Sequence, residues 1–124
     1  LYGEGKGGFC TPGVIILPDD WNWSNVSLSA TAPEWVPGAS DYTNVYSYSD
    51  WAKMEAAGAI FLPASGRRLE NNVNYVGTDG RYWSSTHVSE TSSWYFSFRA
   101  NYVEPADAGT YRYYGFSVRL VSDN

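Results

Sequence analysis

The sequence predicts a single α+β domain with mostly antiparallel short strands, one clear helix and long loops. Two short apolar runs, 14–17 and 59–62, are each followed by a proline and have the length of strands. Between them, residues 47–58 show helical spacing of apolar positions. The second half alternates polar and apolar residues between turns, which is typical of antiparallel strands. We expect residues 1–124 to form one domain, because the chain is too short for two.

The first half of the chain is predicted to contain one buried strand and a long loop. Residues 1–13 are rich in glycine and indicate an irregular leading segment. The run 13–18 predicts a strand buried on both faces, because its β-branched residues are continuous. Residues 19–21 then predict a turn. Residues 22–48 mix serine, asparagine, threonine, proline and tyrosine without a clear period, and we interpret them as a long loop with at most one short edge strand.

The helix is predicted to begin near Ser47. Ser47 and Asp50 have the spacing of a capping box, and Ser49 is a competing N-cap. Gly58 stands where a left-handed residue commonly ends a helix. The next run, 59–63, predicts a second buried strand.

The second half is predicted to be antiparallel β-structure. Residues 77–80 indicate a turn, and 81–86 indicate a strand. In 94–99, aromatic residues alternate with Tyr, Ser and Arg, which predicts one apolar and one polar face. Residues 104–109 are interpreted as a loop, and 116–121 as the final strand. We expect four aromatic residues to belong to the core, namely Trp83, Phe96, Phe98 and Phe116.

Composition excludes several classes of function. A net charge of −5 argues against nucleic-acid binding, which needs a basic surface, and against anionic polymers in general. One cysteine, Cys10, cannot form an intrachain disulfide, and one histidine excludes a two-imidazole metal site. No apolar run approaches the roughly 18 residues of a bilayer span, so we expect no membrane-spanning segment. Because the chain begins at Leu1, we expect it to be a mature or trimmed part of a longer protein.

The chain contains GRYWSST at 80–86, WYFSF at 94–98 and YGFSVRLV at 114–121, in that order. Together with 14–21 and 51–63 upstream, these segments resemble the Fibrobacter succinogenes major paralogous domain family. The similarity covers most of the chain. The resemblance implies a C-type-lectin-like fold and an extracellular or cell-surface location, on bacteria or phage.

The same resemblance carries implications about function. Related variable proteins, diversified by retroelements, present a ligand surface from their C-terminal strands and loops. Related formylglycine-generating enzymes depend on paired cysteines near the C-terminus, whereas this chain has no cysteine after Cys10. Family members usually carry a further N-terminal helix and strand. We therefore expect the chain to be a fragment or a minimal version, whose partner is the missing N-terminal segment or another subunit.

Metal and catalytic sites are not expected. Residues 104–107 are similar to the Glu-Pro-Asn signature of calcium-dependent lectins, but Ala106 supplies no oxygen ligand. No spacing singles out a pair of carboxylates for hydrolysis. Ser84 and His87 are close in sequence, but neighbours along a strand alternate faces. We therefore predict no metal, no other cofactor and no enzymatic activity.

Tyrosine, tryptophan and arginine anchor interfaces, and the sequence contains 11 Tyr and 6 Trp. We predict a ligand-binding domain of the adhesin or receptor-binding type, which recognises a glycan or a protein epitope. Arg119 is instead expected to form an ion pair or to cap carbonyls. The predicted ligand-binding residues are Tyr95, Ser97, Arg99, Asn101, Tyr102, Tyr111, Arg112 and Tyr113.

The sequence is also consistent with two alternatives. The chain is a structural or assembly component whose exposed sheet edge pairs with a partner, or it is a degenerate formylglycine-generating-enzyme-like domain. A third consideration is simpler, because tyrosine is half-exposed in many β-rich proteins and a cluster in sequence can scatter in space.

Overall fold

The computed structural model describes residues 12–26, 46–99 and 102–120. These residues form a mixed α+β fold with one α-helix and mostly antiparallel strands, which confirms that part of the prediction. The leading segment 1–11, most of the predicted loop 22–48, and Asn101 lie outside the described residues. The elements are β1 (Gly13–Ile16), η1 (Trp23–Asn25), α1 (Tyr48–Ala56), β2 (Ile60–Pro63), β3 (Arg67–Leu69), β4 (Asn72–Asn74), β5 (Gly80–His87), β6 (Ser92–Arg99) and β7 (Tyr102–Tyr111).

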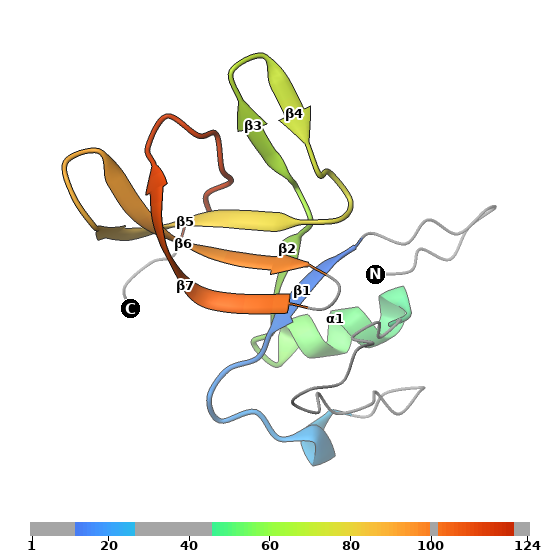
Figure 1. Cartoon of the computed structure of the whole chain (residues 1–124). Coiled ribbons are helices and arrows are strands. Elements are labelled where there is room, and N and C mark those ends of the chain that lie inside the picture. The colour runs from blue at the N-terminus through green and yellow to red at the C-terminus, as the bar shows by residue number, and fades with distance from the viewer. Residues whose placement is uncertain (1–11, 27–45, 100–101, 121–124) are drawn as a thin grey trace.

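β1 and β2 form a two-stranded antiparallel sheet that lies between α1 and the sheet β5-β6-β7 (Figure 1). Ile15 and Phe61, which are paired across this sheet, pack on the core cluster that contains Trp51 and Met54 of α1. Full burial of the first run was a wrong expectation, since Ile16 is 42% exposed. Ile16 is the last residue of β1, and its side chain lines an apolar pocket that is partly open to solvent.

The capping prediction is confirmed at both ends of α1. The Oγ of Ser47 accepts a hydrogen bond of 3.1 Å from the backbone N–H of Asp50, so Ser47 rather than Ser49 is the N-cap. Gly58 has φ +97°, the left-handed conformation that ends a helix. The turn at 19–21 is also confirmed, by a hydrogen bond of 3.0 Å from Trp21 N to the Pro18 carbonyl.

The three-stranded antiparallel sheet has the order β5-β6-β7. One of its faces packs on β2, because Tyr82 and Phe98 form a buried cluster with Leu62. Gly80 makes this packing close: it pairs with Phe98, and any side chain at position 80 would overlap the Phe98 ring. The Tyr82 hydroxyl donates a hydrogen bond of 2.7 Å to the Pro63 carbonyl, which ties the two sheets together.

Two predictions about the last third of the chain are wrong. Residues 104–109, interpreted as a loop, lie within β7, since their backbone pairs with β6 despite Pro105. Residues 116–120 form no strand and make a single bridge, between Tyr82 and Ser117. The predicted core residues are buried at Phe98 and Phe116 and half-buried at Trp83 and Phe96.

A short hairpin, β3-β4, was not predicted from the sequence. Its backbone turns at Glu70, which has φ +53°. The segment that follows β7 lies beside this hairpin, where Arg68 pairs with Gly115 through hydrogen bonds of 2.7 and 2.8 Å (Figure 1). This contact brings two parts of the chain that are nearly 50 residues apart to one side of the sheet.

Candidate ligand-binding surface

Tyr95 and Ser97 do not project into solvent, contrary to the prediction. Each is only 7% exposed, because β6 is the central strand and both of its faces are covered. The Tyr95 ring packs against Trp83 and Phe116, with centroids 6.1 and 4.9 Å away. Both faces of β6 are therefore covered, and the alternation in its sequence does not mark a face that is open to solvent.

A hydrogen-bonded network joins these two residues to β7. Ser97 donates from Oγ to Oδ2 of Asp107 over 3.1 Å. The pKa of Tyr95 lies above its ordinary value of 10.0, first because burial disfavours the phenolate and second because its hydroxyl is hydrogen-bonded to Asp107. The network satisfies buried polar groups and fixes β6 to β7, so Tyr95 and Ser97 are structural.

The remaining predicted residues divide between the two ends of β7. At one end, Arg99 pairs with Tyr102, and its guanidinium carbon lies 5.3 Å from the Tyr102 ring centroid. Tyr111, Arg112 and Tyr113 lie at the other end, nine residues further along the chain. β6 covers the same span in seven residue steps, from Ser92 beside Tyr111 to Arg99 beside Tyr102. A strand rises about 3.3 Å per residue, so the two groups are roughly 20–25 Å apart. The structure thus does not bring them together in one site.

The second group extends into a row of aromatic rings. Tyr111 stacks on Tyr113, with centroids 5.3 Å apart and planes 10° apart, and Tyr113 stacks on Tyr114 at 5.2 Å and 17°. Tyr114 contacts Phe116 at 5.8 Å, and Phe116 stacks on Trp83 at 4.4 Å. We refer to Tyr111, Tyr113 and Tyr114 as the tyrosine ladder. It runs from the covered interior to solvent, where Tyr111 is 53% and Tyr113 69% exposed.

Two arginines pack against these rings. The guanidinium carbon of Arg67 lies 5.4 Å from the Tyr114 centroid and 5.3 Å from that of Tyr75. Arg81 lies 5.8 Å from the Phe116 centroid and 5.9 Å from that of Tyr75. We call the tyrosine ladder, together with Tyr75, Arg67 and Arg81, the tyrosine–arginine surface.

Tyr75 is placed by an unusual backbone conformation, with φ +64°. Its carbonyl accepts hydrogen bonds from the N–H groups of Thr78 and Asp79, at 3.1 and 3.0 Å, and from the Thr78 hydroxyl at 3.0 Å. The turn after β4 therefore holds the Tyr75 ring against both arginines.

Sequence reasoning missed Arg67, Tyr75, Arg81 and Tyr114 as members of a site. The first two belong to the unpredicted β3-β4 hairpin and the turn that follows it. The one signal that pointed in this direction is the density of tyrosines at 111–114, of which Tyr114 is the part facing Arg67.

Arg112 forms its hydrogen bonds within the protein. Its Nη2 donates to the Ser89 carbonyl at 2.8 Å, and its Nε donates to the Ser93 hydroxyl at 3.2 Å. The backbone N–H of Arg112 donates to the Thr91 carbonyl at 2.9 Å. Arg112 thus attaches the turn that carries the ladder to the loop between β5 and β6.

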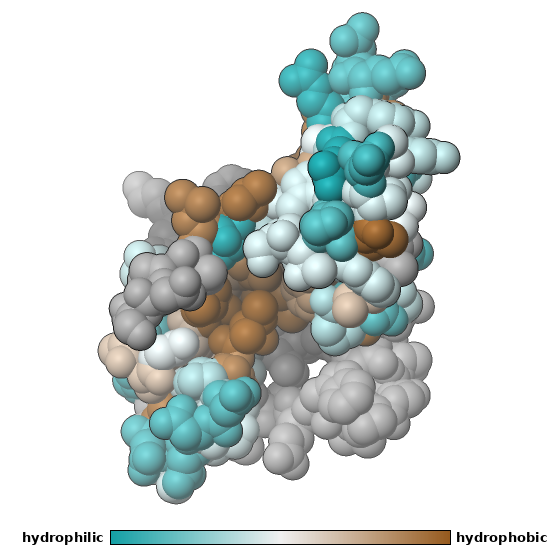
Figure 2. Space-filling model, turned by 90° about the vertical axis from the view of Figure 1, so that its left-hand side faces the viewer, coloured by the Kyte–Doolittle hydropathy of each residue, from teal (hydrophilic) through white to brown (hydrophobic). Residues whose placement is uncertain are grey.

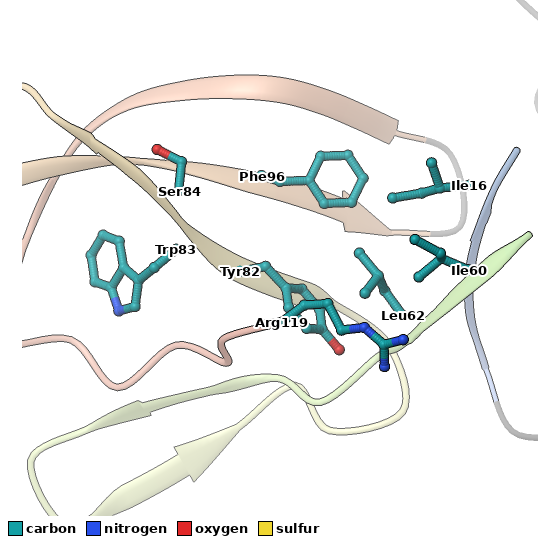
Figure 3. A pocket seen from close by; sticks show the side chains of 8 residues that line it. All are labelled: Ile16, Ile60, Leu62, Tyr82, Trp83, Ser84, Phe96 and Arg119. Atoms are coloured by element: carbon teal, nitrogen blue, oxygen red, sulfur yellow. The ribbon is translucent and has the colours of Figure 1, made fainter. Parts of the chain in front are cut away.

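An apolar pocket lies between β1-β2 and β5-β6, with a volume of about 210 Å³ (Figure 3). Figure 2 shows apolar surface gathered in a hollow of one face of the molecule. Arg119 lines this pocket and forms no ion pair or hydrogen bond with any other described residue, so the ion pair or carbonyl cap expected for it is not observed within that part of the chain. The pocket is lined by Ile16, Ile60, Leu62, Tyr82, Trp83, Ser84, Phe96 and Arg119.

Within the described ranges, no three His, Cys, Asp or Glu side chains are grouped so that they could hold a metal ion. Among the same residues, the single α-helix is neither long nor apolar enough to cross a bilayer.

A family model described as "Domain of unknown function (DUF8237)" matches residues 39–121, which is most of the chain. No curated protein and no solved structure matches the chain significantly.

Proposed function

The chain belongs to the DUF8237 family, and we propose that it is a metal-independent ligand-binding domain that recognises its ligand through the tyrosine–arginine surface. The observation that carries the proposal is the tyrosine ladder, in which two largely exposed rings are held in parallel stacks. Large aromatic side chains in solvent are the usual anchors of a recognition surface. Because stacking already fixes their rotamers, little side-chain entropy is lost on binding.

We also propose the finer fold assignment, a C-type-lectin-like domain displayed on a bacterial or phage surface. It is supported by the resemblance of residues 80–86, 94–98 and 114–121 to the surface-associated family described above. In that resemblance the ligand face is formed by C-terminal strands and loops, and the tyrosine ladder lies in the corresponding part of this chain.

The alternative of an assembly component that pairs through a sheet edge is less well supported. β7 is an edge strand among the described strands, but it contains Pro105, which lacks an N–H donor, and Gly109 with φ +88°. Its register with β6 shifts twice. Proline, bulges and irregular register are features that disfavour pairing with another chain.

A degenerate formylglycine-generating-enzyme-like domain is the remaining alternative. The paired cysteines on which that chemistry depends have no counterpart after Cys10. A turnover assay on a cysteine-bearing peptide tests this alternative directly. Turnover of the peptide would contradict the proposal of a binding domain.

The proposal is tested on glycan and protein arrays with the wild type and Tyr113→Ala. The matched control is Tyr48→Ala, because Tyr48 is a tyrosine of similar exposure, 66% against 69%, on the remote helix α1. We expect Tyr113→Ala to weaken binding at least about tenfold, the cost of removing an interface anchor, and Tyr48→Ala to leave it unchanged. A ligand that binds all three proteins equally would refute the proposed site.

A further inference from the structure

Each ring of the tyrosine–arginine surface uses at least one of its faces within the protein. Each ring of the tyrosine ladder stacks on at least one other ring, and the guanidinium of Arg67 lies over both Tyr114 and Tyr75. An aromatic face is electron-rich, whereas its edge carries partial positive charge. Engaged faces therefore favour the presentation of ring edges and phenol O–H donors to solvent, a surface that attracts electron-rich oxygen atoms.

The two arginines differ in their carboxylate partners. Arg81 has one, since its Nη2 lies 3.7 Å from Oδ2 of Asp79. Arg67 forms no ion pair and no side-chain hydrogen bond with the described residues, and its buried Nε has no acceptor. Its guanidinium is held between two rings and carries a positive charge that no carboxylate among the described residues balances. Such a group is positioned in advance for an anion, and a planar guanidinium matches the geometry of a carboxylate.

We infer that the ligand of the tyrosine–arginine surface is an acidic polysaccharide of the uronic-acid type, one carboxylate of which binds Arg67. This inference rests on the proposed function. We favour a polysaccharide over an acidic peptide for two reasons. The surface offers O–H and N–H donors, which suit a ligand rich in oxygen atoms. A peptide would also need a pocket for an anchoring side chain, but the apolar pocket lies on the other side of the sheet, where Leu62 and Phe96 line it. A dense array of sugar hydroxyls and carboxylates fits these donors.

The acidic net charge of the chain does not oppose this binding at short range. Repulsion from remote carboxylates is screened over about 8 Å at physiological ionic strength. Both guanidinium groups pack on the Tyr75 ring, at 5.3 and 5.9 Å from its centroid, so Arg81 adds positive charge to the same surface. Binding to this surface should therefore weaken as salt is added, because its main attraction is between charges.

The test measures retention on immobilised polygalacturonate, on its methyl ester and on polyglutamate. The methyl ester keeps the sugar backbone and removes the charge, and polyglutamate supplies carboxylates on a peptide. The variant is Arg67→Gln. Its matched control is Arg99→Gln, which makes the same change of net charge and also removes a cation from over a tyrosine, but at the other end of β7.

We expect the wild type and Arg99→Gln to bind polygalacturonate alone, and Arg67→Gln to bind it roughly ten- to a hundredfold more weakly, as the loss of a charge-assisted hydrogen bond implies. Equal binding to the methyl ester, stronger binding to polyglutamate, or equal losses in both arginine variants would overturn the inference.

Circular dichroism checks that Arg67→Gln folds. If it does not, Tyr75→Asn replaces it, since Asn tolerates the positive φ and the change removes one of the two rings that hold Arg67. We then expect several-fold weaker binding, and unchanged binding would again overturn the inference.

Failure of this inference differs from failure of the proposed function. If the arrays identify a neutral glycan or a protein whose binding is lost in Tyr113→Ala but kept in Arg67→Gln, the ligand-binding surface stands and the acidic ligand is wrong. If no ligand responds to Tyr113→Ala, the surface itself is wrong.

Discussion

Nη2 of Arg112 donates a hydrogen bond of 2.8 Å to the backbone carbonyl of Ser89. A second bond, from Nε to the Ser93 hydroxyl, makes the guanidinium a two-point attachment. These contacts connect the turn after β7 to the loop between β5 and β6. The two exposed rings of the tyrosine ladder therefore flank a residue that is fixed to the rest of the protein. Arg112 is thus a positioning residue for Tyr111 and Tyr113.

Arg112→Lys should loosen this turn, because a lysine ammonium cannot reproduce two bonds in the fixed geometry of a guanidinium. We expect faster hydrogen exchange at the Tyr114 amide, which donates to the Tyr111 carbonyl over 3.1 Å, and several-fold weaker ligand binding. Hydrogen-exchange mass spectrometry and a binding titration measure the two effects. Lost binding with unchanged exchange would show that Arg112 contacts the ligand directly.

Tyr95→Phe tests the network that joins β6 to β7. The raised pKa of Tyr95 means that the native state holds the phenolic proton more tightly than the unfolded state. This stabilisation is complete below pH 10.0, the ordinary pKa, and is lost as the pH rises through the folded-state pKa. We therefore expect the free energy of unfolding to fall less steeply above pH 10.0 in Tyr95→Phe than in the wild type.

Urea unfolding followed across this alkaline range supplies the measurement. At neutral pH the variant should be about 1–2 kcal/mol less stable, because the hydrogen bonds of the hydroxyl with Asp107 and Thr110 are lost while the ring packing stays. Parallel pH profiles for the two proteins would contradict the assignment of a raised pKa to Tyr95.

Ser47→Ala and Ser49→Ala separate the two serines that compete for the N-cap. Only Ser47 accepts a hydrogen bond from the Asp50 N–H. Ser47→Ala should cost about 1 kcal/mol of stability, the usual value of a cap, and Ser49→Ala only a few tenths. Thermal or urea unfolding of the two variants gives the comparison, and the reverse order would mean that the helix begins two residues later.

Gly80→Ala should destabilise the core between the two sheets. A methyl group at this position would overlap the Phe98 ring, which must then move within a packed cluster. We expect a loss of about 1–3 kcal/mol, typical of an overpacked core. Ser85→Ala, at an exposed position of the same strand, serves as the control for urea unfolding. Equal stabilities would show that Phe98 does not pack on Gly80.

Local signals in the sequence were enough for the elements that depend on local chemistry. The Ser47 cap, Gly58 at the end of the helix and the turn after Pro18 each follow from a few adjacent residues, and all three are confirmed. The mixed α+β class is also confirmed. It could be predicted because the period of the apolar residues distinguishes α1 from the strands.

The binding residues could not be predicted in the same way, because their positions depend on contacts that are distant in the sequence. Alternation in β6 shows that Tyr95 and Phe96 face opposite sides, but Phe116, about 20 residues later, decides that the Tyr95 side is covered. Similarly, Tyr75 belongs to the tyrosine–arginine surface because the Arg67 guanidinium packs on both Tyr75 and Tyr114. Nothing local to either tyrosine indicates that arrangement.

The most direct test of a ligand at the tyrosine–arginine surface is a residue-by-residue NMR titration of the labelled chain with soluble galacturonate oligomers. We predict amide shifts concentrated at Arg67, at Tyr75 and in residues 111–114, with Arg99 and Tyr102 unaffected at the far end of β7. Shifts centred on Arg99 and Tyr102, shifts centred on the apolar pocket, or no shifts at all would contradict it.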